Sequence, residues 1–140
     1  MCRSVAELRL PAVLVAGLLL TIATGCSRRG PERFRVSGTV THSGKPVQLG
    51  RVVFEPDAAR GNAGPQGFAP IENGRFDTAG PHCKGSIGGP MLLRIDGFEM
   101  TGGEDATASG KLLFASYEEA IDLPRADVVR DFVVPEAPDR

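Results

Sequence analysis

The sequence predicts an all-β protein, a seven-stranded antiparallel β-sandwich preceded by a signal-peptide helix. Three observations support this prediction. Short runs of alternating apolar and polar residues recur along the chain, and clusters of turn-forming residues separate them. The 140 residues include 18 glycines and 11 prolines, so turns are frequent. This pattern of short strands and turns is typical of a sandwich.

The composition is that of an ordinary globular chain and excludes several function classes. Hydrophobic residues make up 41% and charged residues 24% of the chain, and the formal net charge is −1. A basic nucleic-acid-binding protein and a charge-extended disordered chain are therefore excluded. With no Trp and one Tyr, the chain has few aromatic side chains that could stack on sugars or bases.

The first 25 residues are predicted to be a signal peptide. Residues 10–22 (LPAVLVAGLLLTI) are apolar, and Arg3 and Arg9 precede them. The run is shorter than the ~20 residues that span a bilayer. A basic start, a short apolar centre and a small-residue exit describe a secretory signal.

The end of this segment, Ala23-Thr24-Gly25-Cys26, resembles the lipobox of bacterial lipoproteins. In that family the Cys at the cleavage point receives diacylglycerol and becomes the first residue of the mature protein. The resemblance therefore implies lipidation of Cys26 and a lipid-anchored protein of the bacterial cell envelope. The same residues also fit ordinary secretory cleavage, which would give a secreted protein with an unmodified Cys26.

The mature chain is predicted to be one domain. Residues 26–33 are a polar tether, residues 34–135 the β-sandwich and residues 136–140 a tail. Cys2 leaves with the signal peptide and Cys26 is assigned to the lipid, so Cys83 has no partner for a disulfide within the domain. The stability of the domain must then come from its apolar core.

The first two strands are predicted at residues 34–41 and 49–55. In residues 34–41, apolar or glycine positions alternate with polar ones, which is the period of a strand buried on one face. The sequence Ser43-Gly44-Lys45-Pro46 forms a turn, and Pro56 ends the second strand. We expect the two strands to pair as a hairpin.

The next two strands, residues 67–71 and 75–78, flank Asn73-Gly74, a dipeptide typical of tight hairpins. Pro70 has no backbone N–H, so the strand that contains it is predicted to lie at a sheet edge or to end there. Residues 57–66 and 79–90 are predicted to be irregular connections.

The last three strands are predicted at residues 91–95, 112–123 and 128–134, and glycine-rich residues 97–110 connect the first of them to the second. Residues 112–121 also fit a short helix, with Ser109 as its cap and Pro124 as its boundary. The strand is the preferred interpretation, and the helix remains an alternative at this stage.

Several motifs in the first half of the chain resemble prealbumin-like domains, which are similar to the regulatory domain of carboxypeptidases. The motifs are Val36-Ser37-Gly38-Thr39-Val40-Thr41, Gly44-Lys45-Pro46-Val47, Val52-Val53-Phe54 with Pro56, and Gly74-Arg75-Phe76. Small lipoproteins with one such domain are common in planctomycete-type bacteria. Over residues 34–98 the resemblance implies a seven-stranded, Ig-like sandwich. It implies no catalytic, cofactor-binding or metal-binding residue.

The sequence contains no convincing constellation for catalysis or metal binding. His82 and Cys83 are adjacent, and His42 is the only other His. Neighbours in an extended chain point apart, whereas a metal site needs three or four converging ligands and a Cys nucleophile needs its base within reach. No G-x-S-x-G, Walker or H-E-x-x-H motif is present. We therefore expect no enzyme, no cofactor and no metal.

Acidic residues gather in the last third of the chain. On a strand, Glu118 and Asp122 share one face while Glu119 lies on the other. Together with the acids of residues 96–105 they could form a weak Ca²⁺ site, but they lack the spacing of a calcium loop. A solvated acidic face that keeps edge strands soluble is the preferred interpretation.

Charge is unevenly distributed between the two parts of the mature chain. Residues 27–95 carry ten basic and five acidic residues, whereas residues 96–140 carry four basic and eleven acidic ones. This predicts ion pairs between the two parts. Alternatively, the tether region contacts anionic lipid headgroups through its arginines, which are Arg28, Arg29, Arg33 and Arg35.

The expected function is that of a non-enzymatic, lipid-anchored envelope protein for scaffolding, adhesion or partner binding, by strand addition or through loops. Its partners would be the membrane, through the lipid, and an envelope protein or a glycan, but no nucleic acid. The alternative is a small-ligand or carbohydrate-binding module of a secreted protein, for which Tyr117 is the one available sugar platform.

The alternation of residues in the strands also predicts the core. Because side chains two positions apart share a face, one set of apolar residues should face a common interior. Phe98 follows Gly97 out of phase with Leu93 and Ile95, so it should lie nearer the surface. The predicted core consists of Phe34, Val36, Val40, Val52, Phe54, Phe76, Leu93, Ile95, Phe132 and Val134.

Overall fold

The computed structural model describes residues 29–101 and 109–136. The chain divides into two units, Met1–Gly30 and Pro31–Arg140, and the second contains the folded domain. The predicted signal peptide, Cys26 and most of the predicted tail lie outside the described residues. Within the described ranges, no helix has the length and apolarity needed to cross a membrane.

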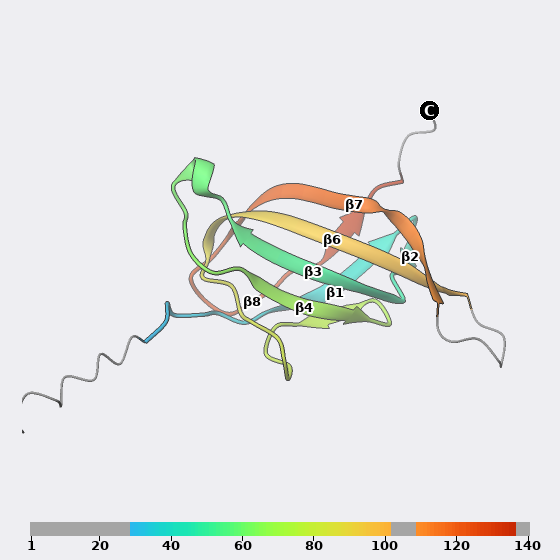
Figure 1. Cartoon of the computed structure of the whole chain (residues 1–140), viewed down its shortest axis with the longest axis horizontal. Helices are drawn as coiled ribbons and strands as arrows, with labels where there is room; N and C mark the ends of the chain where they lie inside the picture. The colour runs from blue at the N-terminus through green and yellow to red at the C-terminus, as the bar shows by residue number, and fades with distance from the viewer. Residues whose placement is uncertain (1–28, 102–108, 137–140) are drawn as a thin grey trace, which may run out of the picture. The chain divides into compact units, whose positions relative to one another are not determined.

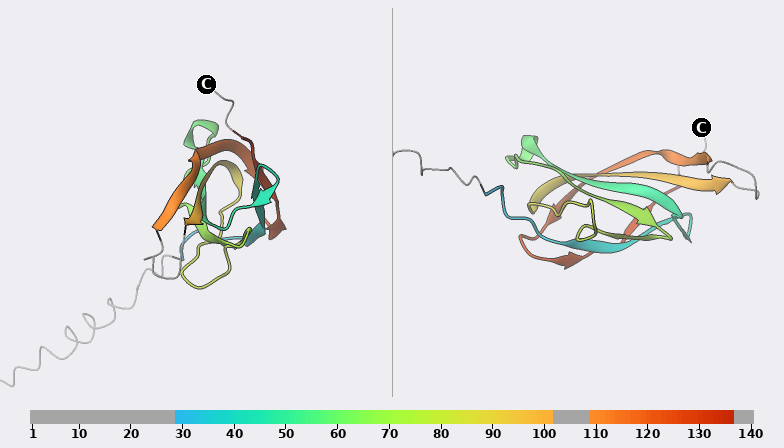
Figure 2. Two further views of the ribbon diagram at one scale, coloured as in Figure 1. Left: turned by 90° about the vertical axis from the view of Figure 1, so that its right-hand side faces the viewer. Right: turned by 60° about the horizontal axis from the view of Figure 1, so that its bottom comes forward.

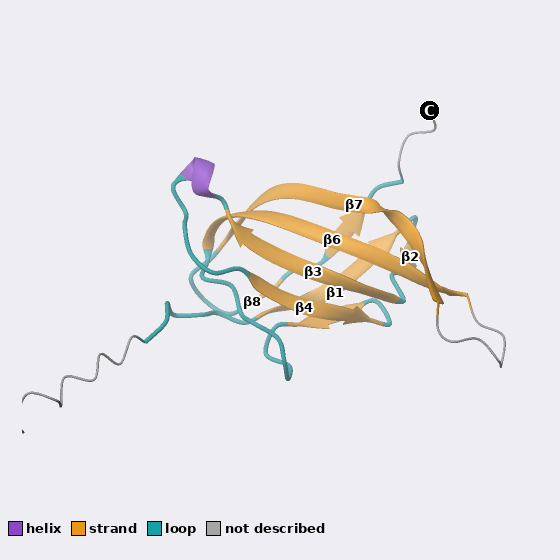
Figure 3. Cartoon of the chain, in the orientation of Figure 1, coloured by secondary structure: helices purple, strands orange, loops and turns teal. Residues whose placement is uncertain are grey.

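The described residues form nine strands and one 3-10 turn, shown in Figures 1 and 3. The all-β prediction is confirmed. Every predicted strand is found, but β2 is an additional short strand, and the last predicted strand is divided in two. The elements are β1 (Val36–His42), β2 (Lys45–Pro46), β3 (Leu49–Pro56), η1 (Ala58–Arg60), β4 (Gly67–Glu72), β5 (Arg75–Asp77), β6 (Gly89–Thr101), β7 (Ser109–Leu123), β8 (Val128–Val129) and β9 (Phe132–Val134).

The strands belong to one sheet that curls around the core, as the views in Figure 2 show. Its order is β2-β1-β5-β4-β3-β6-β7, with antiparallel neighbours throughout. Strands β8 and β9 pair with β1 in parallel, which the antiparallel prediction did not include. The long chain between β1 and β8 permits this, since a parallel pair needs a long connection.

The predicted hairpin between residues 34–41 and 49–55 is wrong in its pairing. The chain that follows the turn at Ser43 and Gly44 pairs with β1 only over the two residues of β2, whereas β3 pairs with β4 and β6. The reason lies at Val47, whose side chain is buried. Its N–H donates to Val40 O at 3.0 Å, and its own carbonyl accepts from Gly74 N at 2.8 Å. The β4–β5 turn therefore occupies the position beside β1 that the prediction gave to β3.

The strand that contains Pro70 was predicted to lie at a sheet edge or to end there, and both alternatives are wrong, because β4 lies between β3 and β5 and continues to Glu72. The tight hairpin at Asn73-Gly74 is confirmed, with both residues at positive φ. However, β5 pairs only with Ile71 and Glu72 of β4. Pro70 lies just beyond that pairing, so its missing N–H costs no hydrogen bond to β5.

Residues 97–110 were predicted to be a connection, but their described ends continue β6 and β7. The helix considered for residues 112–121 is excluded, because they belong to β7. Gly97 is suited to its place in β6 because a Cβ there would lie 2.5 Å from the ring of Phe114. Two register shifts between β6 and β7 fall on either side of Gly97, so the glycine marks a bulge in the sheet.

The predicted core is confirmed at nine of its ten positions. The exception is Phe34, which is half buried and precedes β1, where it forms an isolated bridge with Ser86. Phe98 is half buried, as predicted from its phase. The core also contains residues that the prediction left out, namely Val47, Ala69, Ile71, Met91, Ile121 and Leu123.

The strand directions give the domain two distinct ends. The chain enters at Pro31 at what we call the tether end, which also holds residues 57–66, 78–88 and 124–127. The opposite, distal end holds residues 43–48, the turn at 73–74 and the last described residues, 134–136. Figure 1 shows η1 at the tether end and the last described residues, in red, at the distal end.

Candidate functional site

The candidate metal and nucleophile residues do not converge. His82 is exposed in a loop at φ 62°, and the adjacent Cys83 thiol donates to the carbonyl of Pro81 at 3.6 Å. His42 ends β1 at the distal end, where its Nδ1 lies 3.2 Å from Val134 O. Among residues 29–101 and 109–136, no group of three or more His, Cys, Asp or Glu side chains could hold a metal ion.

The acidic residues of β7 lie on the faces that the sequence predicted, and two of them form ion pairs. Glu118 accepts from Arg94 Nε at 2.9 Å, and Asp122 lies 3.2 Å from Arg60 Nη1. On the opposite face, Glu119 accepts from the hydroxyl of Tyr117 at 3.1 Å. Burial, together with this hydrogen bond, raises the pKa of Tyr117. The predicted pairing between the basic and acidic parts of the chain is thus confirmed at these two arginines.

Arg33 and Arg35, both predicted to contact lipid headgroups, contact other residues of the domain. Arg33 donates through Nη1 to the carbonyls of Gln66 at 3.1 Å and Gly85 at 2.7 Å. Arg35 pairs with Asp77, and the guanidinium lowers the pKa of that carboxyl. Among residues 29–101 and 109–136, the side chain of Arg33 bonds to carbonyl oxygens and to no carboxylate, whereas Arg35 forms an ion pair.

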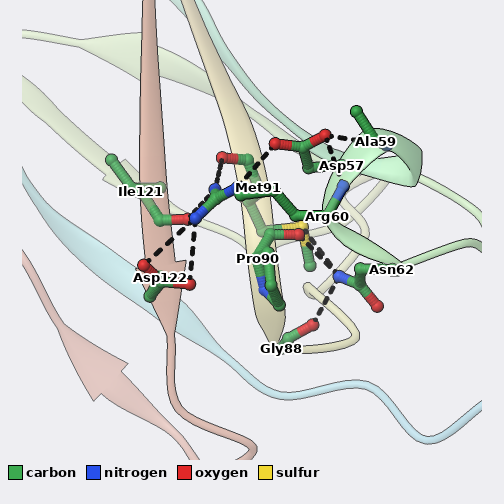
Figure 4. A network of polar contacts seen from close by, with 9 residues as sticks. All are labelled: Asp57, Ala59, Arg60, Asn62, Gly88, Pro90, Met91, Ile121 and Asp122. Carbon is green, nitrogen blue, oxygen red and sulfur yellow. Dashed lines mark hydrogen bonds and ion pairs between the residues drawn. The ribbon is translucent and has the colours of Figure 1, made fainter.

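A polar network holds the tether end together, and Figure 4 shows it from close by. Asp57 caps η1 by accepting from the backbone of Ala59 and Arg60 at 3.1 and 3.3 Å. The Arg60 side chain returns to Asp57 at 2.7 Å and also donates to the carbonyls of Met91 and Ile121. The hydrogen bond from Arg60 lowers the pKa of Asp57.

The side chain of Asn62 completes this network. It is buried, and its Nδ2 donates to Gly88 O at 3.0 Å and to Pro90 O at 2.7 Å. The network therefore fastens the loop after β3 to the start of β6 and the end of β7. The network joins segments of the protein to one another, so its role is structural.

A side groove of about 670 Å³ lies over β1, β5 and β4. Outward-facing residues of these strands form its floor, and the loop at Gly80–Cys83 and the segment at Val129–Asp131 border it. Its charged lining residues are Arg35, Glu72, Arg75, Asp77 and Asp131. A groove with both signs of charge and hydroxyl groups can bind a polar partner, but it holds no paired nucleophile and base.

Two residues shape the wall of the side groove at the break between β8 and β9. A Cβ on Gly38 would overlap the carbonyl oxygen of Arg130, so only glycine allows this close approach. Asp131 then accepts from both N and Oγ1 of Thr39, each at 2.8 Å. These bonds lower the pKa of Asp131. The sequence analysis missed both roles, although a glycine inside a strand is a signal of close backbone approach.

A second hollow of about 410 Å³ lies at the distal end, between the β1–β2 turn and the β6–β7 pair. His42, Lys45 and Glu99 contribute polar groups to its lining, and Phe98 and Leu113 contribute apolar ones. The side chains of Met100 and Leu112 on the neighbouring strands are 57% and 54% exposed. Exposed apolar side chains therefore flank the distal hollow.

Comparison with known protein families, with curated proteins and with solved structures finds no match to this chain. The fold and surface define the class only as an all-β protein made of one curled sheet with a polar side groove.

Proposed function

We propose that this chain is a non-enzymatic, lipid-anchored protein of the bacterial cell envelope whose β-domain binds a partner molecule. One observation carries the proposal. Cys26, at the end of a signal-like segment, is separated by only residues 27–30 from the folded unit that begins at Pro31. A lipid on Cys26 would hold this domain at the membrane surface.

The length of this connection determines which surfaces a partner could reach. From Cys26 to Pro31 an extended chain spans at most about 18 Å, so the tether end would stay close to the bilayer. The 13 residues of β6 run away from that end and span about 40 Å. The distal end and the side groove would then be open to the envelope space.

The side groove is the surface that we assign to the partner. Its two arginines and three carboxylates suit an extended polypeptide with both signs of charge. The alternative of a carbohydrate-binding module has less support. Tyr117, the one Tyr of the chain, is half buried and hydrogen-bonded to Glu119, so it presents no free platform for a sugar.

We also propose that the curled sheet is a variant of the seven-stranded prealbumin-like sandwich. Two features of the motif residues support this proposal. Gly44 and Gly74 lie in turns at positive φ, and the apolar residues of the motifs lie in the core, namely Val36, Val40, Val47, Val52, Phe54 and Phe76. Taking β8 and β9 as one interrupted strand, and β2 as an extension toward β3, gives seven units.

Metabolic labelling with a fatty-acid probe in a bacterial host tests the anchor. The wild type and Cys83→Ser should be labelled, and Cys26→Ser should not. Cys83→Ser is the matched control because Cys83 is the other cysteine of the mature chain. Equal labelling of Cys26→Ser would refute lipidation at this residue.

Cross-linking in intact envelopes tests partner binding in the groove. The wild type and the distal variant Lys111→Glu should yield the same cross-linked partner, and Arg75→Glu should lose it, because Arg75 lines the groove. Recovery of the same partner at the same yield from Arg75→Glu would exclude the groove as the binding site.

A further inference from the structure

We propose that the tether end of the domain docks on anionic lipid headgroups through a basic row formed by Arg33, Lys84 and Arg125. This inference rests on the proposed lipid anchor and adds to it a defined orientation of the domain on the membrane. It differs from the contact expected of the tether region alone, since two of the three cations lie in loops far along the chain.

The three cations lie along one short segment, residues 84–88. Arg33 Nη1 donates to Gly85 O at 2.7 Å, and Lys84 immediately precedes that glycine. At the other end of the segment, a Cβ on Gly88 would lie 2.8 Å from Cγ of Arg125. An extended segment of this length spans about 13 Å, so the row is compact.

The backbone around the row is held in place. Phe34 and Ser86 exchange two backbone hydrogen bonds of 2.7 and 3.0 Å, and Phe68 and Lys84 exchange two more of 2.8 and 3.0 Å. Lys84 and Arg125 are exposed to solvent, and their side chains take part in no ion pair among the described residues. The charges are thus presented on a fixed platform.

The balance of charge favours an anionic surface at this end. Glu32 and Asp127 are the exposed carboxylates nearest the row in the sequence, and Asp127 accepts from the backbone of Arg35. The nearby pair of Arg35 and Asp77 is neutral. In the sequence, Arg28 and Arg29 add two positive charges between Cys26 and the domain. The tether end is therefore net positive, although the whole chain has a net charge of −1.

Chain length supplies the second argument for a lipid surface. If Cys26 is inserted in the bilayer, residues 27–32 are all that separate it from Arg33, so the backbone of Arg33 cannot lie more than about 25 Å from the headgroups. Each basic residue near an anionic surface favours contact by about fivefold. The attraction falls steeply when salt shortens the Debye length.

The test uses the full, acylated protein in vesicles of neutral phosphatidylcholine, with or without anionic phosphatidylglycerol. Hydrogen exchange is followed in residues 79–88 and 124–127 at the tether end and in residues 43–48 at the distal end. We expect anionic lipid to protect the two tether-end segments only, and 0.5 M salt to remove this protection.

Matched charge reversals separate docking from a general effect of charge. The double variant Lys84→Glu/Arg125→Glu should lower the ratio of docked to undocked protein at least about 25-fold, at about fivefold for each basic residue. The distal control Lys45→Glu/Lys111→Glu changes the net charge by the same amount and should leave the ratio of docked to undocked protein unchanged. Equal effects of the two double variants, or protection from exchange that is the same on neutral and anionic vesicles, would overturn the inference.

The mass of each sample distinguishes failure of the inference from failure of the anchor. An acylated protein whose tether end gains no protection on anionic vesicles overturns the docking and leaves the anchor standing. A protein that carries no acyl group on Cys26 overturns both.

Discussion

The carbonyl oxygen of Arg130 occupies the space that a side chain on Gly38 would need. This approach lets the chain between β8 and β9 cross close to β1, with Arg130 N donating to Ser37 O at 2.8 Å. It also brings Asp131 to Thr39, which forms the wall of the side groove. A single glycine in β1 thereby links the packing of the last strands to the shape of the candidate site.

Gly38→Ala should therefore destabilise the domain by about 3 kcal/mol or more, at or beyond the upper end of the usual cost of overpacking. The clash is with backbone, which cannot rotate away as a side chain could. Urea unfolding of the variant and the wild type measures the difference.

Gly44→Ala is the control for this experiment. No atom lies within 4 Å of a Cβ built on Gly44, and its φ is +73°. The substitution should cost only about 1–2 kcal/mol, through the left-handed backbone. A larger loss in Gly44→Ala than in Gly38→Ala would contradict the close approach of Arg130.

Phe54→Ala should cost about 3–5 kcal/mol, a large part of the ~5–15 kcal/mol that stabilises an ordinary domain. Phe54 is fully buried, and its ring centroid lies 6.1 Å from that of Phe76 and 6.2 Å from that of Phe132. The loss should appear as a lower midpoint in thermal and urea unfolding.

Phe98→Ala is the matched control, because Phe98 is only half buried. It should cost clearly less than Phe54→Ala. Unfolding by Phe98→Ala, with Phe54→Ala melting like the wild type, would show that the strand register is wrong.

These two phenylalanines also show what the sequence could predict. Alternation along a strand is a local property, so the faces of Phe54, Phe98, Glu118 and Asp122 could be read from parity alone. Pairing between strands is not local. The place of β3 depends on the bonds of Val47 to Val40 and Gly74, and nothing in residues 49–55 encodes them.

The site was less accessible to sequence analysis for the same reason. Asp131 and Thr39 are 92 residues apart, and Arg60 and Asp122 are 62 apart. No spacing rule joins such residues before the fold is known. The lone signals were Gly38 inside a strand and the opposite charge of the two parts of the chain.

Asn62→Ala should destabilise the tether end by about 1–3 kcal/mol, because Gly88 O loses its hydrogen bond from Asn62 Nδ2. Hydrogen exchange should accelerate in residues 57–62 and 88–91, with little change at the distal end. The control is Gln66→Ala, since the Gln66 side chain is exposed. Uniform acceleration across the domain in Asn62→Ala would contradict a local role for the network.

The stability of the domain should fall on acidification because three carboxyls are bound more tightly when ionised. The hydrogen bond from Arg60 lowers the pKa of Asp57, that from Arg35 lowers the pKa of Asp77, and those from Thr39 lower the pKa of Asp131. In the unfolded chain each of these groups has a pKa near ~3.9. A carboxyl whose folded pKa lies below its unfolded pKa contributes stability that is fully present above about pH 5. That contribution is lost as the pH falls through the folded pKa.

Denaturant midpoints measured from pH 7 down to pH 2 test this dependence. The wild type should be flat above about pH 5 and then lose stability steadily. Asp57→Asn removes one of the three titrating groups, so its curve should start lower at pH 7 and fall less below pH 4. Glu99→Gln is the control, because it replaces an exposed carboxyl at the distal end, and its slope should match that of the wild type. A slope for Asp57→Asn as steep as that of Glu99→Gln would mean that the bond between Arg60 and Asp57 adds nothing to the acid sensitivity of the fold.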